Sequence, residues 1–387
     1  MKILNVCDIM NPLYGGSVER TYQISFQLNN LGHEVDLLTT KWNLDKDYIK
    51  SIKGSKTFVL KAIALRTGIN PNLIPLGLNK WINSNLDNYD VIHVSRNWSL
   101  LSSFVAIKAY QKGIPYVYSP MGFVSITNGS KLLKKVYKKL FTISNLKNAS
   151  AILTVAKQES KDIVQLGVDY SKVHLIPNGV IPQDFSFKDD VLFRDSNKLD
   201  KRKIILFIGR MDPVKGVDIL IDAFSEMKDI HQDWCLVIIG TKTSYRKEMI
   251  KKSRNLNMDK NIIFLDPIFG DAKSSAYHAA DFIVIPSLID AMTIIAPEAA
   301  CCKKPVLYTN TCDFSELSEN GGGIEVDPSV SSIKKGIILM INSDRLSMGE
   351  KGYKYVIENY DWNNLALQYL KVFKSVIYDT SIVGRIK

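Results

Sequence analysis

Short apolar runs alternate with longer amphipathic stretches along the whole chain. In the second half these runs have four to six residues each, which is the length of a buried parallel strand. Because strands that alternate with helices imply parallel sheets, the pattern predicts an α/β protein. The expected strands of the first half are 2–8, 34–39, 91–94, 116–119, 152–155 and 173–176, and those of the second half are 204–208, 234–239, 261–265, 282–285 and 305–309.

A polar segment of mixed charge, 184–202, separates the two series of strands and is expected to be a linker. The chain has 387 residues, which corresponds to two or three domains at about 150 residues each. We therefore expect one domain over 1–183 and another over 203–360. The final segment, 361–387, is expected to be helical from Trp362 onward.

Two carboxylates follow the apolar run that ends at Ile285. Pro286 stops this run because it cannot donate to a sheet ladder, and Asp290 and Glu298 come after it, eight positions apart. Pro297 suits the first turn of a helix, so the second acid is expected where the next helix starts. Ligands of an open α/β sheet bind at this edge. The alternative is a solvated turn before a helix whose dipole favours an N-terminal acid.

A second apolar run ends at Gly209 and is followed by two cations, Arg210 and Lys215, and then by a helix. Cations beside a helix N-terminus make a site for a diphosphate. Carboxylates such as those after Ile285 accept hydrogen bonds from hydroxyl groups. A diphosphate for the cations and hydroxyls for the carboxylates together describe a sugar nucleotide.

These stretches resemble the retaining glycosyltransferases of sequence family 4, whose signature is a Glu, seven residues and a second Glu, preceded by a Gly-Arg…Lys-Gly segment. The resemblance also includes the pair Gly15-Gly16, the segment 177–180 and the pair Pro305-Val306, and it spans nearly the whole chain in the expected order. Two positions depart from the family pattern. Asp290 replaces the first signature Glu, and Met121-Gly122 stands where the family often has His-Gly.

The resemblance implies the GT-B fold, with two Rossmann-like domains whose parallel sheets face an interdomain cleft and a C-terminal helix that crosses back to the first domain. It implies that the second domain binds the donor. Glu298 would hold the ribose hydroxyls, Arg210 and Lys215 the diphosphate, and Asp290 would lie nearest the transferred sugar. Further donor-side residues are expected at Gly15, Gly16, Gly209, Gly240, Met292 and Thr293, and acceptor-side residues of the cleft at Met121, Gly122 and Asn178.

By the same resemblance the reaction is a retaining sugar transfer by front-side attack, in which the departing phosphate takes the acceptor's proton. No protein nucleophile, cofactor or metal is then required. Family precedent favours a UDP-sugar as donor, followed by GDP-mannose. The paired glycines are not a G-x-G-x-x-G fingerprint, so NAD is not expected. They also fit an ordinary strand-to-helix turn.

Charge is distributed unevenly between the two halves. Residues 1–183 contain 22 Lys or Arg and 11 Asp or Glu, whereas 184–387 contain 28 of each. The excess of +11 suits an anionic partner, or it is a solubilising surface. Within this half, the pattern of residues 131–140 predicts an amphipathic helix. Five lysines cover most of it, and its apolar face consists of Leu132, Leu133, Val136, Tyr137 and Leu140.

Basic amphipathic helices bind anionic membranes. We therefore expect a peripheral enzyme on the cytoplasmic membrane face that extends a lipid-linked glycan, as in bacterial surface-polysaccharide assembly. The alternative is that the apolar face packs on the domain core.

No apolar run approaches the ~18 residues that span a membrane, and the chain starts with a strand pattern instead of a signal peptide. The five cysteines show no C-x-x-C spacing, which indicates reduced thiols in a cytoplasm.

Three other functional classes remain open. A GT-B epimerase or phosphorylase would use the same fold for different chemistry. A non-catalytic nucleotide-sugar binder would explain the departures at Met121 and Asp290. A nucleic-acid binder is suggested only by the charge, and the sequence lacks the aromatic stacking motifs of the common RNA modules, so nucleic acid is not an expected partner.

His93 ends an apolar run and is interpreted as a structural histidine.

Overall fold

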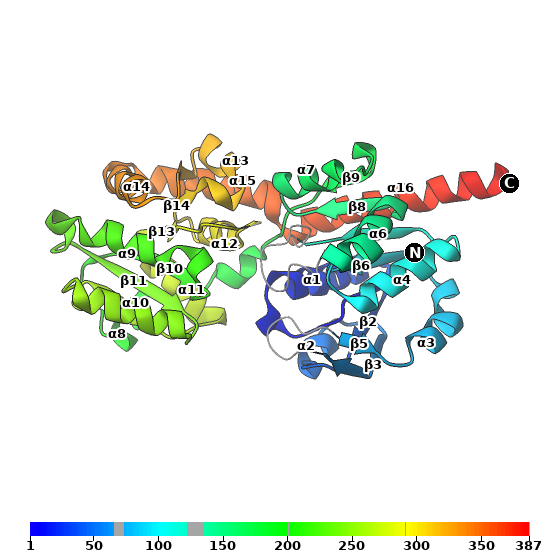
Figure 1. Cartoon of the computed structure of the whole chain (residues 1–387). Helices are drawn as coiled ribbons and strands as arrows, with labels where there is room; N and C mark the ends of the chain where they lie inside the picture. The colour runs from blue at the N-terminus through cyan, green and yellow to red at the C-terminus, as the bar shows by residue number, and fades with distance from the viewer. Residues whose placement is uncertain (66–72, 122–134, 200, 291, 387) are drawn as a thin grey trace. The chain divides into compact units, whose positions relative to one another are not determined.

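The computed structural model describes residues 1–65, 73–121, 135–199, 201–290 and 292–386. The chain divides into two compact units (Figure 1). Unit 1 contains Met1–Asn178 and Trp362–Lys387, and unit 2 contains Gly179–Asp361. The predicted α/β class and the two parallel sheets are confirmed.

Unit 1 is built on a seven-stranded parallel sheet in the order β3-β2-β1-β6-β7-β8-β9. Its strands are β1 (Lys2–Val6), β2 (Glu34–Thr40), β3 (Thr57–Leu60), β6 (Val91–Ser95), β7 (Tyr116–Ser119), β8 (Ala151–Thr154) and β9 (Val173–Leu175), and an antiparallel pair is formed by β4 (Ala62–Ala64) and β5 (Leu73–Pro75). Its helices are α1 (Gly16–Asn30), α2 (Lys46–Lys50), α3 (Leu78–Asn85), α4 (Leu100–Gln111), the π-helical turn η3 (Lys138–Thr142), α6 (Ile143–Asn148), α7 (Lys157–Gln165) and α16 (Trp362–Ile386). Short 3-10 turns lie at η1 (Pro12–Tyr14), η2 (Leu86–Asn88) and η4 (Tyr170–Lys172).

Alternate residues of the central strands of unit 1 face opposite helix layers. In β1, Leu4 belongs to the apolar cluster formed with α3 and α4, whereas the amide of Asn5 donates to Ser25 Oγ of α1. In β6, the ring of His93 points the other way from Ile92 and lies against Tyr369 of α16. This period of two is the geometry of a strand covered on both faces.

Unit 2 is built on a six-stranded parallel sheet in the order β12-β11-β10-β13-β14-β15. Its strands are β10 (Lys203–Gly209), β11 (Trp234–Gly240), β12 (Ile262–Leu265), β13 (Phe282–Ile285), β14 (Val306–Thr309) and β15 (Gly323–Val326). Its helices are α8 (Asp190–Ser196), α9 (Val217–Ser225), α10 (Ser244–Asn255), α11 (Gly270–Ala279), α12 (Ile295–Cys301), α13 (Ser315–Glu319), α14 (Val330–Asn342) and α15 (Arg345–Tyr360). Its 3-10 turns are η5 (Pro182–Phe185), η6 (Pro213–Lys215), η7 (Lys228–Ile230) and η8 (Asn310–Cys312).

The sheet of unit 2 separates two apolar cores. Ile204 and Leu206 of β10 pack with α8, α11, α12 and α15 on one face, and Ile205 and Phe207 pack with α9, α10 and α14 on the other. The near-continuous apolar runs that predicted these strands reflect burial on both faces.

The chain differs from expectation at the segment 184–202 and at the strands β3, β4, β5 and β15. The parts of the expected linker that the structure describes, 184–199 and 201–202, belong to unit 2. Phe193 of α8 and Leu199 lie in the core beside α11, so this segment is part of the packed domain. Strand β15 was not expected, because its short sequence, Gly323–Val326, contains a glycine and a glutamate.

Three further expectations concern the membrane, the cysteines and His93. No helix in the part of the chain that the structure describes combines the length and the apolar character needed to cross a membrane. All five cysteines are buried free thiols. His93 is fully buried, with its ring nitrogens 3.0 Å from Asn5 Oδ1 and 2.8 Å from Ser119 Oγ. Burial, together with the charge of Arg20, lowers the pKa of His93 to about 3, so the ring is neutral and structural.

Candidate active site

The predicted donor motifs meet where the strand order of unit 2 changes direction. From β10 the chain continues to β11 and β12 on one side, whereas β13 pairs with the other side of β10 and leads to β14 and β15. The carboxyl ends of β10 and β13 are therefore neighbours at a topological switch point, where α/β sheets bind their ligands. Gly209 is the last residue of β10 and Arg210 follows it, and the loop 286–290 follows β13.

The loops after β10 and β13 are joined to each other. The backbone amide of Leu288 donates to the carbonyl of Val214 at 2.8 Å, and that of Ile289 donates to the same oxygen at 3.3 Å. Gly216 has φ +63°, and a Cβ atom there would lie 2.0 Å from the carbonyl oxygen of Pro286. Only glycine permits this close approach together with the left-handed backbone.

One predicted cation and one predicted carboxylate form an ion pair at this switch point. Lys215 Nζ lies 2.6 Å from Asp290 Oδ2, and the two side chains are 20% and 13% exposed. Ser287 Oγ also donates to Asp290 Oδ2, at 3.3 Å. Arg210 is exposed, and within the described residues its guanidinium has no hydrogen-bond or ion-pair partner. One cation is thus held in place by the ion pair, and the other is exposed directly after β10.

Glu298 is held by two side chains of α11. Lys273 Nζ lies 2.7 Å from Glu298 Oε1, and the hydroxyl of Tyr277 donates to Glu298 Oε2 at 2.6 Å. Burial and the neighbouring carboxylate hold the pKa of Tyr277 well above its usual value, so this hydroxyl remains a donor. Glu298 lies in α12, whose first residue is Ile295, so Pro297 is the third helical residue and not the first.

The other residues expected on the donor side of unit 2 make contacts within the protein. Gly240 pairs with Gly209 across β11 and β10, and a Cβ atom on Gly240 would lie 2.7 Å from the carbonyl oxygen of Gly209 and from Cγ of Met211. Met292 belongs to the apolar core, and Thr293 Oγ1 accepts from the backbone amide of Ile295.

Unit 1 has its own switch point, between β1 and β6. Arg96 Nη1, just after β6, lies 3.1 Å from Asp8 Oδ1, just after β1. Arg96 has φ +71°, a strained value for a residue with a side chain. Gly15 has φ +84°, and a Cβ atom on Gly15 or Gly16 would meet no atom within 4 Å, so the backbone conformation, and not crowding, calls for glycine at position 15.

The acceptor-side positions are described only in part. Met121 follows β7, is 7% exposed and has φ +61°, and Gly122 lies outside the described residues. Asn178 Oδ1 accepts from Arg20 Nη1 at 3.1 Å, and Arg20 is itself buried against the ring of Tyr369. Asn178 is therefore tied to α1 and α16 of unit 1.

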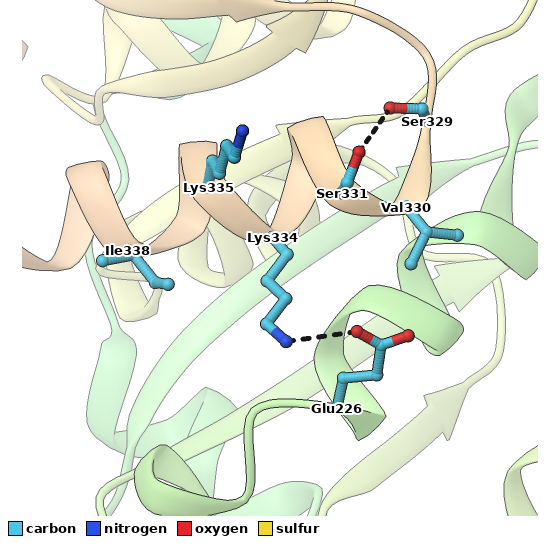
Figure 2. A pocket seen from close by; sticks show the side chains of 7 residues that line it. All are labelled: Glu226, Ser329, Val330, Ser331, Lys334, Lys335 and Ile338. Carbon is cyan, nitrogen blue, oxygen red and sulfur yellow. Dashed lines mark hydrogen bonds and ion pairs between the residues drawn. The ribbon is translucent and has the colours of Figure 1, made fainter.

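A separate groove of about 640 Å³ lies along α14 of unit 2 (Figure 2). Lys334 Nζ and Glu226 Oε2 form an ion pair across it at 3.1 Å, with both side chains over one third exposed. The groove contains none of the residues that the sequence predicts for the donor. Its other lining residues are Ser329, Val330, Ser331, Lys335 and Ile338.

Sequence reasoning missed four charged or polar residues at these edges. Lys273 and Tyr277 were not singled out because helix α11 meets Glu298 only through the fold. Arg96 comes directly after β6 and Asp8 two residues after the end of β1, and this position at the carboxyl ends of strands was the signal that could have identified them.

Comparison with known proteins identifies the class. The model of the family described as "Glycosyltransferase Family 4" matches residues 14–184, and that of "Glycosyl transferases group 1" matches residues 188–360. Together with the two parallel-sheet units, these matches define a GT-B glycosyltransferase. The chain belongs to the family 4, or group 1, glycosyltransferases, and the resemblance that the motifs suggested is confirmed.

Two relatives and one solved structure illustrate the similarity. The chain is 26% identical to an uncharacterized glycosyltransferase of Methanocaldococcus jannaschii, over 89% of this chain and 90% of the relative. It is 25% identical to the lipopolysaccharide 1,2-N-acetylglucosaminetransferase of Salmonella typhimurium, over 59% of this chain and 64% of that protein. The crystal structure of Anabaena HepE in complex with UDP-glucose shares the fold, with a TM-score of 0.77 at 18% identity over 97% of this chain and all of HepE.

Proposed function

We propose that this glycosyltransferase is a retaining enzyme that takes a sugar from a nucleoside diphosphate sugar bound by unit 2. The observation that carries the proposal is the ion pair of Lys215 with Asp290 at the switch point, where the exposed Arg210 also follows β10. Two cations suit the diphosphate, and Glu298 suits the ribose hydroxyls. A UDP-sugar is our first choice of donor and GDP-mannose the second, and the UDP-glucose complex of HepE supports this order by analogy.

In the proposed reaction, the bond between the anomeric carbon and the diphosphate oxygen breaks as Arg210 and Lys215 stabilise the departing charge. Such electrostatic stabilisation commonly dominates this kind of catalysis. The acceptor hydroxyl bonds to the same face of the anomeric carbon, and its proton passes to the departing phosphate. Asp290 is proposed to lie nearest the transferred sugar. The thioether of Met121 has no proton to give and acts only by packing.

We further propose that the acceptor binds unit 1 and is a lipid-linked glycan of a bacterial surface polysaccharide. The relative from Salmonella typhimurium, a lipopolysaccharide 1,2-N-acetylglucosaminetransferase, supports this choice of acceptor by analogy. Residues 91–158 contain ten Lys or Arg and no Asp or Glu. Val136 and Leu140 are 49% and 61% exposed beside exposed Lys135 and Lys139. These features suit the anionic cytoplasmic face of a membrane.

The described part of the predicted helix 131–140 divides the expected apolar face. Tyr137 turns inward and donates to the backbone carbonyls of Asn97 and Ser99, whereas Val136 and Leu140 turn outward. Packing on the domain core therefore accounts for Tyr137 alone. Residues 131–134, including Leu132 and Leu133, lie outside the described part of the chain.

Replacing the two signature acids should have different effects. Glu298→Gln is expected to raise the dissociation constant of the free nucleoside diphosphate by about 10- to 100-fold, because a hydrogen bond to a charged group contributes about 1.5–3 kcal/mol. Asp290→Asn is expected to lower turnover mainly, because its contact is with the sugar. Calorimetric titration with UDP and GDP, together with transfer assays on UDP-sugars and GDP-mannose, measures both effects. If both variants lose free nucleotide binding equally, this division of roles is wrong.

Anionic liposomes should bind the protein at low salt, and binding should weaken as salt screens the charges. Changing Lys135, Lys138 and Lys139 together to Gln should weaken flotation with these liposomes about a hundredfold, at roughly 1 kcal/mol for each lysine near the surface. A matched control changes three exposed lysines of unit 2, Lys228, Lys247 and Lys251, to Gln. Equal losses in both triple variants, or no flotation of the wild type, would rule out this membrane surface and leave a soluble acceptor.

A further inference from the structure

We propose that Lys273 and Tyr277 are positioning residues that set the Glu298 carboxylate to accept both ribose hydroxyls, and that they thereby make the enzyme select ribonucleotides over 2′-deoxyribonucleotides. This inference rests on the proposed function, in which Glu298 binds the ribose. It goes beyond that function because it predicts discrimination between ribose and 2′-deoxyribose in the nucleotide and assigns this discrimination to two residues.

The geometry leaves Glu298 with two matched acceptors. Lys273 and Tyr277 are four residues apart on α11, so their side chains lie on the same face of the helix. Each engages a different carboxylate oxygen, Oε1 at 2.7 Å and Oε2 at 2.6 Å. A carboxylate oxygen can accept about two hydrogen bonds. One acceptor direction therefore remains on each oxygen, and a pair of neighbouring hydroxyls supplies the two donors.

The surroundings hold the two donors in place. Tyr277 is fully buried, and its ring meets that of Phe185 edge to face at 5.9 Å between centroids. The Lys273 ammonium lies 6.0 Å above the same Phe185 ring. The side chains of Lys273 and Glu298 are 21% and 11% exposed, so the pair is largely removed from water. Without Lys273 the carboxylate would lose its counterion and one of the two contacts that fix its rotation.

Lys273 also makes an anionic donor compatible with an acidic ribose site. A carboxylate close to a nucleoside diphosphate adds a like charge, which disfavours binding. The ammonium of Lys273 neutralises that charge from the side of the protein, so the hydroxyl-accepting function of Glu298 is kept. A purely stabilising ion pair would serve the fold equally well with any ligand. It would have no effect on the choice between ribose and deoxyribose.

The test compares UDP with 2′-deoxy-UDP, and GDP with 2′-deoxy-GDP, by calorimetric titration. For the base that binds, the wild type should prefer the ribonucleotide by tenfold or more, the loss expected for one hydrogen bond to a charged group. Lys273→Met and Tyr277→Phe should each reduce this preference to about threefold or less. Lys273→Arg, which keeps the charge and a donor, should restore most of it.

Lys252→Met is the matched control. Lys252 of α10 pairs with Asp222 at 2.6 Å, close to the 2.7 Å of the Lys273 pair, and the two lysines are 29% and 21% exposed. This variant should keep the full ribose preference. If Lys273→Met and Tyr277→Phe keep the wild-type preference while Glu298→Gln loses it, the positioning role is refuted and the proposed function stands. If none of UDP, GDP and ADP binds the wild type, or if Glu298→Gln keeps the preference, the proposed ribose site fails and this inference fails with it.

Discussion

Replacing Lys215 by alanine should reduce sugar transfer by about a hundredfold or more while the chain remains folded. Removing one preorganised group that stabilises transition-state charge typically costs a factor of about 10² to 10³ in turnover. The Lys215 ammonium is preorganised by its 2.6 Å contact with Asp290 and by the hydrogen bond between the two loops, from Leu288 to Val214. Initial rates of transfer and the melting temperature together measure the effect.

Two companion variants separate charge loss from damage to the fold. Arg210→Ala should lower transfer with no change in melting temperature, because the guanidinium has no partner within the described part of the chain. Lys252→Ala breaks an ion pair of the same length, between α10 and α9, that contains none of the predicted site residues, and it should leave transfer unchanged. If both Lys215→Ala and Arg210→Ala keep transfer within about threefold of the wild type, the diphosphate site is misassigned.

Gly216→Ala should destabilise unit 2 and abolish donor binding in the same variant. The new Cβ would lie 2.0 Å from the carbonyl oxygen of Pro286, and no side-chain rotation can relieve a contact between Cβ and backbone. The loops that carry Lys215 and Asp290 would have to separate. Misplacement of a catalytic group by about 1 Å can cost a factor of about 10². Thermal unfolding and titration with UDP and GDP measure the two losses.

Gly113→Ala is the control for backbone strain. Gly113 has φ +68°, close to that of Gly216, but a Cβ atom there would meet nothing within 4 Å. It therefore carries the cost of a left-handed alanine, about 1–2 kcal/mol, without the collision. Equal melting temperatures for the two variants, with nucleotide binding intact in Gly216→Ala, would show that the contact with Pro286 does not hold the site together.

The strands of unit 2 could be predicted closely because their burial on both faces leaves an apolar run in the sequence. The run at 282–285 coincides with β13, and 204–208 lies within β10. Strand β15 was missed because Glu325 and Gly323 interrupt its apolar character. Helix α8 was hidden in a polar segment, since a single residue of it, Phe193, is buried. Burial of one side chain does not produce a periodic signal.

The motifs predicted Lys215 and Asp290 at this edge of the sheet, but not that they contact each other. Asp290 and Lys215 belong to separate motifs, and their ion pair depends on the close approach of two loops at Gly216. The contacts of Glu298 with Lys273 and Tyr277 link segments more than twenty residues apart, and spacing alone could not reveal them. Met292, which was expected on the donor side, lies in the apolar core of unit 2, and its position within the motif gives no signal of that packing.

The most direct test of the account is whether unit 2 binds a nucleoside diphosphate through Lys215 and Glu298. Thermal unfolding with UDP, GDP and ADP should reveal one nucleotide that stabilises the wild type by ~2.7 kcal/mol at 100 times its dissociation constant. The double variant Lys215→Ala/Glu298→Gln should lose this stabilisation, and Lys252→Met should keep it. If no nucleoside diphosphate stabilises the wild type, or if the double variant is stabilised as much as the wild type, the donor site described here is contradicted.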